Sequence, residues 1–130
     1  MSMTLAEIKA EVMFQTNNDV EDLNEFEPYI VNYVNAGYEQ LVDAYMDKHV
    51  GYADGDVIPL SGANDVPELP DYAHYGLVDY ATYLVYRNGN ATKQNRGMAF
   101  YSAFAELIPK LKYEKNGNRS ARSFINIYTR

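Results

Sequence analysis

The placement of helix-breaking residues limits the fold of this chain more than any other feature. Glycine and proline cluster between residues 50 and 70, as Gly51, Gly55, Pro59, Gly62, Pro67 and Pro70. So many breakers exclude a helix in this stretch. On both sides of it, apolar residues recur at the spacing of an α-helix. The pattern therefore predicts two helical halves joined by a long connection.

The N-terminal half carries signals for two helices. Thr4 and Glu7 have the spacing of a capping box, which predicts that a first helix begins at residue 5 and ends in the polar cluster 15–19. Pro28 suits the first turn of a second helix that runs to about Lys48, with only a short helical turn over 20–26 before it. The apolar positions of these two helices predict their core faces: Leu5, Ile8, Val12, Met13, Ile30, Val31, Val34, Tyr38, Leu41, Val42 and Tyr45.

The C-terminal half predicts a helical hairpin. A third helix should begin after Pro70, with Asp71 as its cap or first-turn acid, and end at residues 88–90. A fourth should span about 91–108, where Pro109 ends or kinks it. Because so few residues separate the two helices, we expect them to pack antiparallel.

Two segments fall outside these helices. In the long connection, Asp54-Gly55 between short apolar runs is compatible with a small β-hairpin, and a connection of this length usually has a functional role or is ordered by a partner. Near the C-terminus, residues 115–118 indicate a flexible spacer, and 123–129 are rich in β-branched and aromatic residues that favour a strand. A lone strand either folds back on its own domain or adds to another chain, and we favour the second.

These patterns together predict a mostly α protein. The expected fold is a bundle of about four helices, with a long loop between the second and third helices and an extended C-terminal tail. Residues 1–112 would form the helical domain and 113–130 the tail. At 130 residues the chain has room for one core.

Charge is divided unevenly along the chain. Residues 1–79 contain sixteen acids and two bases, a net charge of −14, whereas residues 80–130 contain nine bases and two acids, a net charge of +7. One interpretation is a solvated acidic face beside a basic terminus. The other is that the acidic part of one copy meets the basic part of another copy or of a different protein.

The sequence contains no motif of a known catalytic or cofactor site. There is no cysteine, no phosphate-binding glycine loop, no nucleophile elbow and no metalloprotease helix. His49 and His74 lie far apart in sequence and are more typical of helix ends than of metal ligands. No apolar run is long enough to span a membrane. We therefore expect no enzyme activity, no cofactor and no membrane partner.

Tyrosine is unusually frequent, with thirteen in a chain that has no tryptophan. Tyr80, Tyr83 and Tyr86 recur every three residues on the expected third helix, with Tyr72 and Tyr75 before them. These rings either cover the edge of the core, with their hydroxyls in water, or form an interface between subunits.

Several of these runs resemble the head-to-tail adaptor (connector) proteins of tailed bacteriophages. The resemblance lies in residues 69–81 (LPDYAHYGLVDYA), in 87–90 (RNGN), in Ala99-Phe100-Tyr101 with Phe104, and in 35–41 (NAGYEQL) of the second helix. It covers about residues 4–112 and includes the helix lengths and the position of the loop.

The resemblance implies a structural virion protein. Such proteins form a ring, typically of twelve copies, that lies under the portal protein in the virion neck and joins the DNA-filled capsid to tail or neck proteins. DNA would pass through the channel without specific binding, and before assembly the chain would lie in the host cytoplasm. The alternative is a small acidic binding or inhibitor protein of the DNA-mimic type, acting as monomer or dimer. The residues expected to contact partners are Arg119, Arg122, Phe124, Ile125, Ile127, Tyr128, Arg130, Tyr83, Tyr86 and Arg87.

Overall fold

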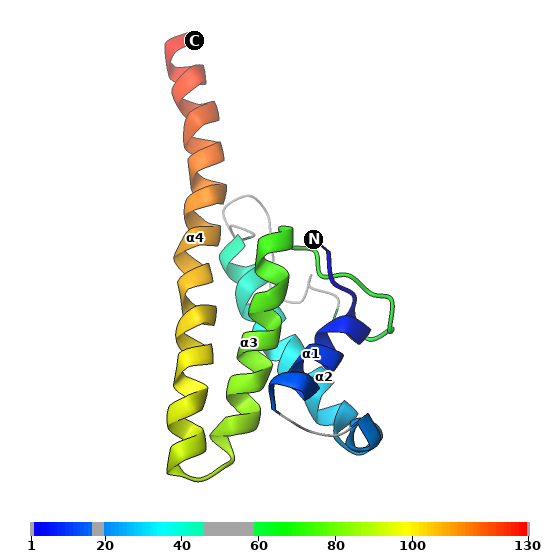
Figure 1. The fold of residues 1–130 in the computed structure, drawn as a ribbon. Coiled ribbons are helices and arrows are strands. Elements are labelled where there is room, and N and C mark those ends of the chain that lie inside the picture. The colour runs from blue at the N-terminus through cyan, green and yellow to red at the C-terminus, as the bar shows by residue number, and fades with distance from the viewer. Residues whose placement is uncertain (1, 17–19, 46–58, 130) are drawn as a thin grey trace.

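The described part of the structure, a computed structural model, is built of helices. It comprises residues 2–16, 20–45 and 59–129, with side chains described except for 20–24, 26 and 114–129. Within these residues there are four helices, α1 (Leu5–Gln15), α2 (Val20–Tyr45), α3 (Asp71–Arg87) and α4 (Ala91–Thr129), and no strand (Figure 1). The predicted mostly α fold with four helices is confirmed. The hairpin considered near residues 54–55 lies outside the described residues.

Helix α1 begins at the predicted capping box. The backbone N–H of Glu7 donates to the Thr4 hydroxyl (3.3 Å), and the backbone N–H of Thr4 donates to the Glu7 carboxylate (3.0 Å). These bonds satisfy amides at the helix start that have no partner within the helix. The predicted core residues Leu5, Ile8 and Val12 are fully buried.

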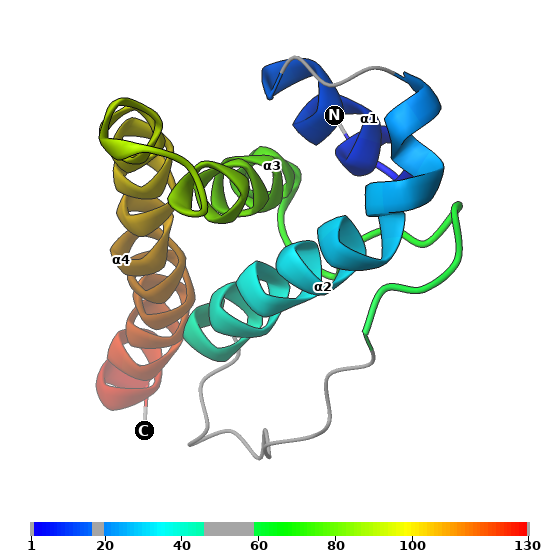
Figure 2. The same cartoon turned by 90° about the horizontal axis from the view of Figure 1, so that it is seen from below.

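Helix α2 begins eight residues before Pro28, so the prediction that Pro28 opens this helix was wrong. Proline removes one backbone hydrogen bond from a helix interior, and such positions commonly bend the helix. The first turns of α2 lie at an angle to the rest of the helix in Figures 1 and 2. This bend accommodates Pro28 inside the helix. From the sequence alone, the same proline is interpreted as the first turn of a helix.

Helices α3 and α4 form the predicted antiparallel hairpin, and α3 starts and ends where the sequence places it. Two glycines lie where the helices approach each other. A Cβ on Gly76 would overlap the Leu107 side chain, and one on Gly97 would come within 2.9 Å of the Tyr86 Cβ. The hairpin therefore packs closely because both positions lack a side chain.

Helix α4 corrects the prediction for the C-terminal segment. It does not end at Ile108 but continues through Pro109 to Thr129, so residues 115–118 are helical and 123–129 are not an extended strand. A lone strand leaves its backbone groups unpaired, whereas a helix satisfies them within itself, so the β-propensity of 123–129 does not decide its structure. Figure 1 shows α4 rising beyond the start of α3. No boundary between an extended tail and the helical domain falls at residue 112.

The described part of the connection, residues 59–70, is held on the helical core. The Asn35 side chain both donates to the Leu60 carbonyl (2.9 Å) and accepts from the Leu60 N–H (2.8 Å). The Leu5 N–H donates to the Asp65 carbonyl (2.8 Å), and the Glu68 N–H donates to the Tyr38 hydroxyl (2.9 Å). This part of the loop is ordered by its own chain.

His74 has a structural position at the start of α3. It is 1% exposed, its Nδ1 accepts from the Met3 N–H (3.0 Å) and its Nε2 lies 2.9 Å from the Leu69 carbonyl. The carbonyl can only accept, so the Nε2 atom carries the proton. His74 thus ties the N-terminus and the loop to α3, and His49 lies outside the described residues.

Candidate protein interface

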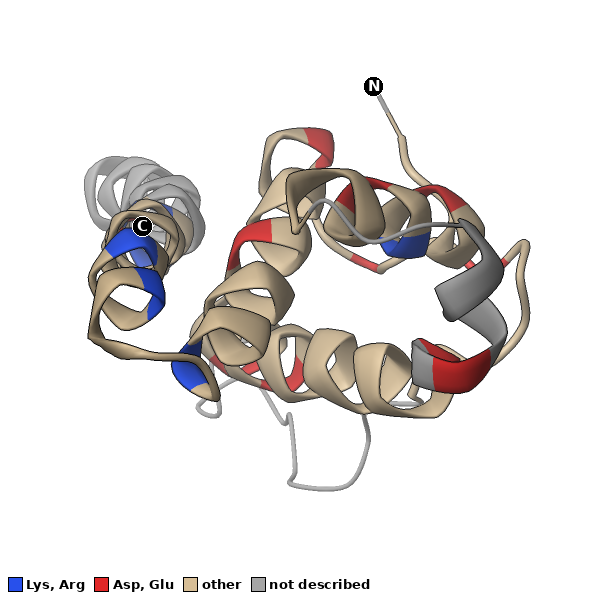
Figure 3. Cartoon of the chain, turned by 60° about the horizontal axis from the view of Figure 1, so that its bottom comes forward, with Lys and Arg blue, Asp and Glu red and all other residues tan. Residues whose placement is uncertain are grey.

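The turn between α3 and α4 carries a group of basic side chains. Arg87, Lys93 and Arg96 are all exposed, and none forms an ion pair with another described residue. Asn90 caps α4 by accepting the Lys93 N–H at its side-chain oxygen (3.0 Å), and the first turn of α4 contains no acid. Figure 3 shows Lys and Arg gathered at this end, whereas Asp and Glu dominate the described parts of α1, α2 and α3. The uneven charge of the sequence is thus also a separation in space.

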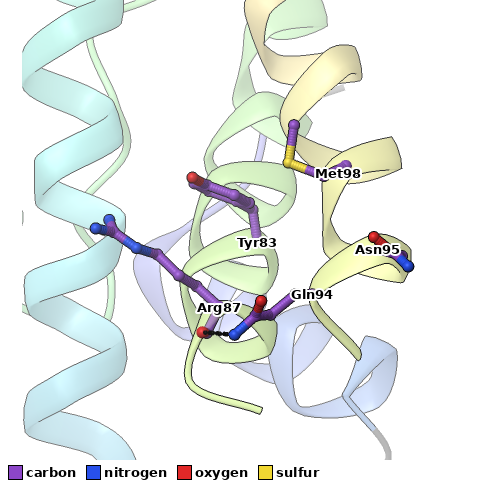
Figure 4. A pocket seen from close by; sticks show the side chains of 5 residues that line it. All are labelled: Tyr83, Arg87, Gln94, Asn95 and Met98. Atoms are coloured by element: carbon purple, nitrogen blue, oxygen red, sulfur yellow. Dashed lines mark hydrogen bonds between the residues drawn. The ribbon is translucent and has the colours of Figure 1, made fainter. Parts of the chain in front are cut away.

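A hollow of about 400 Å³ lies beside this basic turn. It is lined by Tyr83 and Arg87 of α3 and by Gln94, Asn95 and Met98 of α4 (Figure 4). The Gln94 amide donates to the Arg87 carbonyl (3.3 Å) and to the Gly89 carbonyl (3.0 Å), which fixes one wall. Met98 is 49% exposed. The hollow combines a cation, amides and apolar surface, a composition that suits a protein partner.

An aromatic band runs along the hairpin above the hollow. The ring centroids of Tyr83 and Tyr101 are 4.9 Å apart, and those of Tyr80 and Phe104 are 4.5 Å apart. Phe104 is fully buried, whereas Tyr101 is partly exposed. The inner rings therefore complete the core, as one interpretation of the sequence expects, whereas the outer rings remain accessible and the subunit interface stays a prediction.

The residues predicted to bind partners divide into three groups. Tyr83 and Arg87 lie together at the hollow. Tyr86 is instead buried within its own chain, with its ring 5.9 Å from that of Phe100 and its hydroxyl donating to the Gln15 carbonyl (2.9 Å). Arg130 and the side chains of Arg119, Arg122, Phe124, Ile125, Ile127 and Tyr128 lie outside the described residues.

Sequence reasoning missed Gln94, Asn95 and Met98 in the wall of the hollow. These residues fall off the apolar stripe of α4, so the periodicity that identifies its core face passes over them. Their position just after the Asn88-Gly89-Asn90 turn was the available signal, because a tight hairpin brings the start of α4 beside the end of α3.

Asp79 is the one described carboxyl whose pKa is raised to about 6, and the cause is burial. It lies partly buried on α3, with no hydrogen bond to another described residue. A carboxylate in such a place is partly removed from water and has no compensating charge from another described residue. By contrast, Lys9 and Glu27 compensate each other across α1 and α2, with 2.9 Å between the ammonium and a carboxylate oxygen.

Within the described residues, no group of three or more histidine, aspartate or glutamate side chains is placed to hold a metal ion. The described helices also include none with the length and apolarity needed to cross a bilayer. Comparison with family models, with curated proteins and with solved structures finds no match to this chain.

Proposed function

We propose that this chain is a structural virion protein, a head-to-tail adaptor that forms a ring under the portal and joins the DNA-filled capsid to the tail. The observation that carries the proposal is the separation of exposed charge between the basic α3–α4 turn and the acidic surface of the other helices. Two unlike patches on one chain favour a heterologous contact, in which the turn of one copy meets the acidic surface of the next. Such a contact repeats around an axis and closes into a ring when its rotation allows.

Other features support the same role. The hollow at Tyr83 and Arg87 adjoins the basic turn and offers apolar area beside the charge. The part of α4 that rises beyond α3 supplies further helix for contact with a second protein. The acidic composition of residues 1–79 suits a channel wall, because it repels the phosphates of passing DNA.

The test is the number of copies bound to the portal protein from the same genome. We expect the purified chain to be a monomer or weakly associated, and to form a complex of about twelve copies on the portal ring, as native mass spectrometry would measure. Ordering at the interface would then take place on docking. A stable ring of the purified chain at micromolar concentration would contradict assembly on the partner.

A charge-reversed variant tests the observation directly. Arg87→Glu combined with Arg96→Glu should prevent assembly on the portal, because two of the three basic side chains at the turn become acidic. Lys112→Glu is the control, since it reverses an exposed base on α4 away from the turn. If the double variant assembles as well as the control, the turn is not the contact. If the chain stays a monomer or dimer and ignores the portal, the acidic binding protein becomes the better proposal.

A further inference from the structure

Asp79 lies in a row of tyrosines on α3. The residues seven and four before it are Tyr72 and Tyr75, and those four and seven after it are Tyr83 and Tyr86. In an α-helix these spacings bring side chains to the same face. Tyr72 and Tyr75 are 38% and 39% exposed, so the row reaches the surface.

The row lies between the contacts that α3 makes with α1 and with α4. The Tyr75 hydroxyl donates to the Glu11 carboxylate of α1 (3.1 Å) and accepts from the Gln15 amide (2.8 Å). The Tyr83 ring packs on Tyr101 of α4. Both tyrosines next to Asp79 are thus held in place by the neighbouring helices.

Nothing in the described part of the chain compensates the Asp79 carboxylate. It makes no ion pair there, and the one base of α1, Lys9, is engaged by Glu27. One turn further along α3, the Thr82 hydroxyl is fully buried and has no hydrogen-bond partner among the described residues. Fully buried polar groups without a partner are rare in folded proteins, and the Asp79 carboxylate differs from Thr82 in being only partly buried.

The same row already holds a cation at one end. The Lys110 ammonium of α4 lies 4.2 Å from the centroid of the Tyr72 ring. A ring face attracts cations through its quadrupole, and a carboxylate adds a full charge and two acceptor oxygens. A divalent metal is a poor fit, because a single carboxylate supplies too few ligands. The combination of a carboxylate and aromatic rings suits an organic cation.

We propose that Asp79, between Tyr75 and Tyr83, binds the guanidinium group of an arginine from a partner protein. Guanidinium is the better match than ammonium, because it is planar, stacks on aromatic rings and pairs with both oxygens of a carboxylate. The partner's arginine would supply the positive charge that the described residues of this chain do not place beside Asp79. This site does not depend on the adaptor role, since any protein partner with an exposed arginine could use it.

The probe for this site is N-acetylarginine amide, with N-acetylcitrulline amide as its uncharged isostere. Titration of the isotope-labelled full chain, followed by amide chemical shifts, should show saturable changes centred on residues 75–83 with arginine and none with citrulline. Asp79→Asn should weaken arginine binding by about tenfold or more, as expected for a lost hydrogen-bonded charge. Glu39→Gln removes the charge of an exposed acid on α2 and is the matched control, which should bind as the unmodified chain does.

The aromatic contribution is tested separately. Tyr83→Phe keeps the ring and should retain binding, whereas Tyr83→Leu removes the ring and should weaken it by several-fold. The retained amide spectrum shows that each variant is folded. Equal binding by Asp79→Asn and the unmodified chain, or equal shifts with arginine and citrulline, would overturn the proposal. Equal loss in Glu39→Gln would also overturn it, because general charge attraction would then explain the binding.

Discussion

At the scale of single residues, the most unusual group in the described part of the chain is a carboxyl that is partly removed from water and has no counter-charge there. Burial raises the pKa of Asp79 to about 6, well above the ordinary value of 3.8. The tyrosines around it were evident in the sequence from their spacing. The absence of a charge partner for Asp79 among the described residues was not evident, because it depends on how α1 and α4 pack against α3 and on Lys9 being engaged by Glu27. Local spacing predicts which residues share a face, but only the fold decides which charges remain uncompensated.

Asp79→Asn should change how stability depends on pH. Because the folded-state pKa is the higher one, the folded chain holds a proton between pH 4 and 6 that the unfolded chain has lost. This group therefore contributes stability at low pH that is lost as pH rises toward and through about 6. After allowance for solvent screening, we expect the variant to be more stable at pH 7 by about 1–2 kcal/mol.

Urea unfolding of both proteins at several pH values measures this effect. The difference in unfolding free energy between variant and unmodified chain should grow from pH 4.5 to pH 7. Glu39→Gln provides the baseline for removing one acid from an acidic protein. A difference that does not change with pH would mean that Asp79 is well solvated.

At the scale of elements, the sequence predicted those features that depend on neighbouring residues. The capping box at Thr4 and the start and end of α3 are local signals, and the structure confirms them. The interior prolines of α2 and α4 were misjudged, because one lost hydrogen bond does not end a helix when the turns on either side continue it. The C-terminal segment was misjudged because β-propensity is a weak guide where no neighbouring strand is available.

Gly76 should be required for the close packing of α3 on α4. Alanine favours an isolated helix over glycine by about 1 kcal/mol, so a stabilising change would be expected at an unconstrained site. Here the added Cβ meets Leu107, and overpacking of this kind costs about 1–3 kcal/mol. We expect Gly76→Ala to lower the free energy of unfolding by about 1–2 kcal/mol.

A double-mutant cycle with Leu107→Ala separates the clash from other causes. The smaller side chain makes room for the new methyl group, so Gly76→Ala should cost less in that background than in the unmodified chain. Additive effects of the two substitutions would show that the glycine is not needed for the contact.

At the scale of the whole molecule, charge is divided between helices that lie in different parts of the structure. The described acids lie mainly on α1, α2 and α3, and the described bases gather at the α3–α4 turn and along α4. The unequal charges of the two parts of the chain were evident in the sequence. Their separation in space required the hairpin, which carries the start of α4 to the end of the bundle.

If unlike charges join neighbouring copies, assembly on the portal should weaken with salt. The Debye length falls from about 10 Å at 0.1 M to about 3 Å at 1 M ionic strength, which screens exposed pairs strongly. Sedimentation velocity across this range should show a progressive loss of complex. Assembly that is insensitive to salt would assign the contact to the tyrosines and the C-terminal part of α4.

Deletion of residues 113–130 tests the part of α4 that rises beyond the other helices. Tyr72, near the start of α3, contacts Lys110, so α4 passes the start of α3 there, and the deleted part of the helix (113–129) extends for about 25 Å at about 1.5 Å per residue. Leu111 is the last buried side chain in the described part of α4, so the core cluster is retained in the truncated chain. We expect a folded helical domain that no longer joins its partner, as circular dichroism and portal binding would measure.

The apolar residues of this segment should matter more than its arginines, because burial of a large apolar side chain contributes about 1.5–3 kcal/mol, against about 1 kcal/mol or less for an exposed ion pair. An unfolded truncation would place the segment in the core of its own chain, and normal assembly would leave the interface to the hairpin alone.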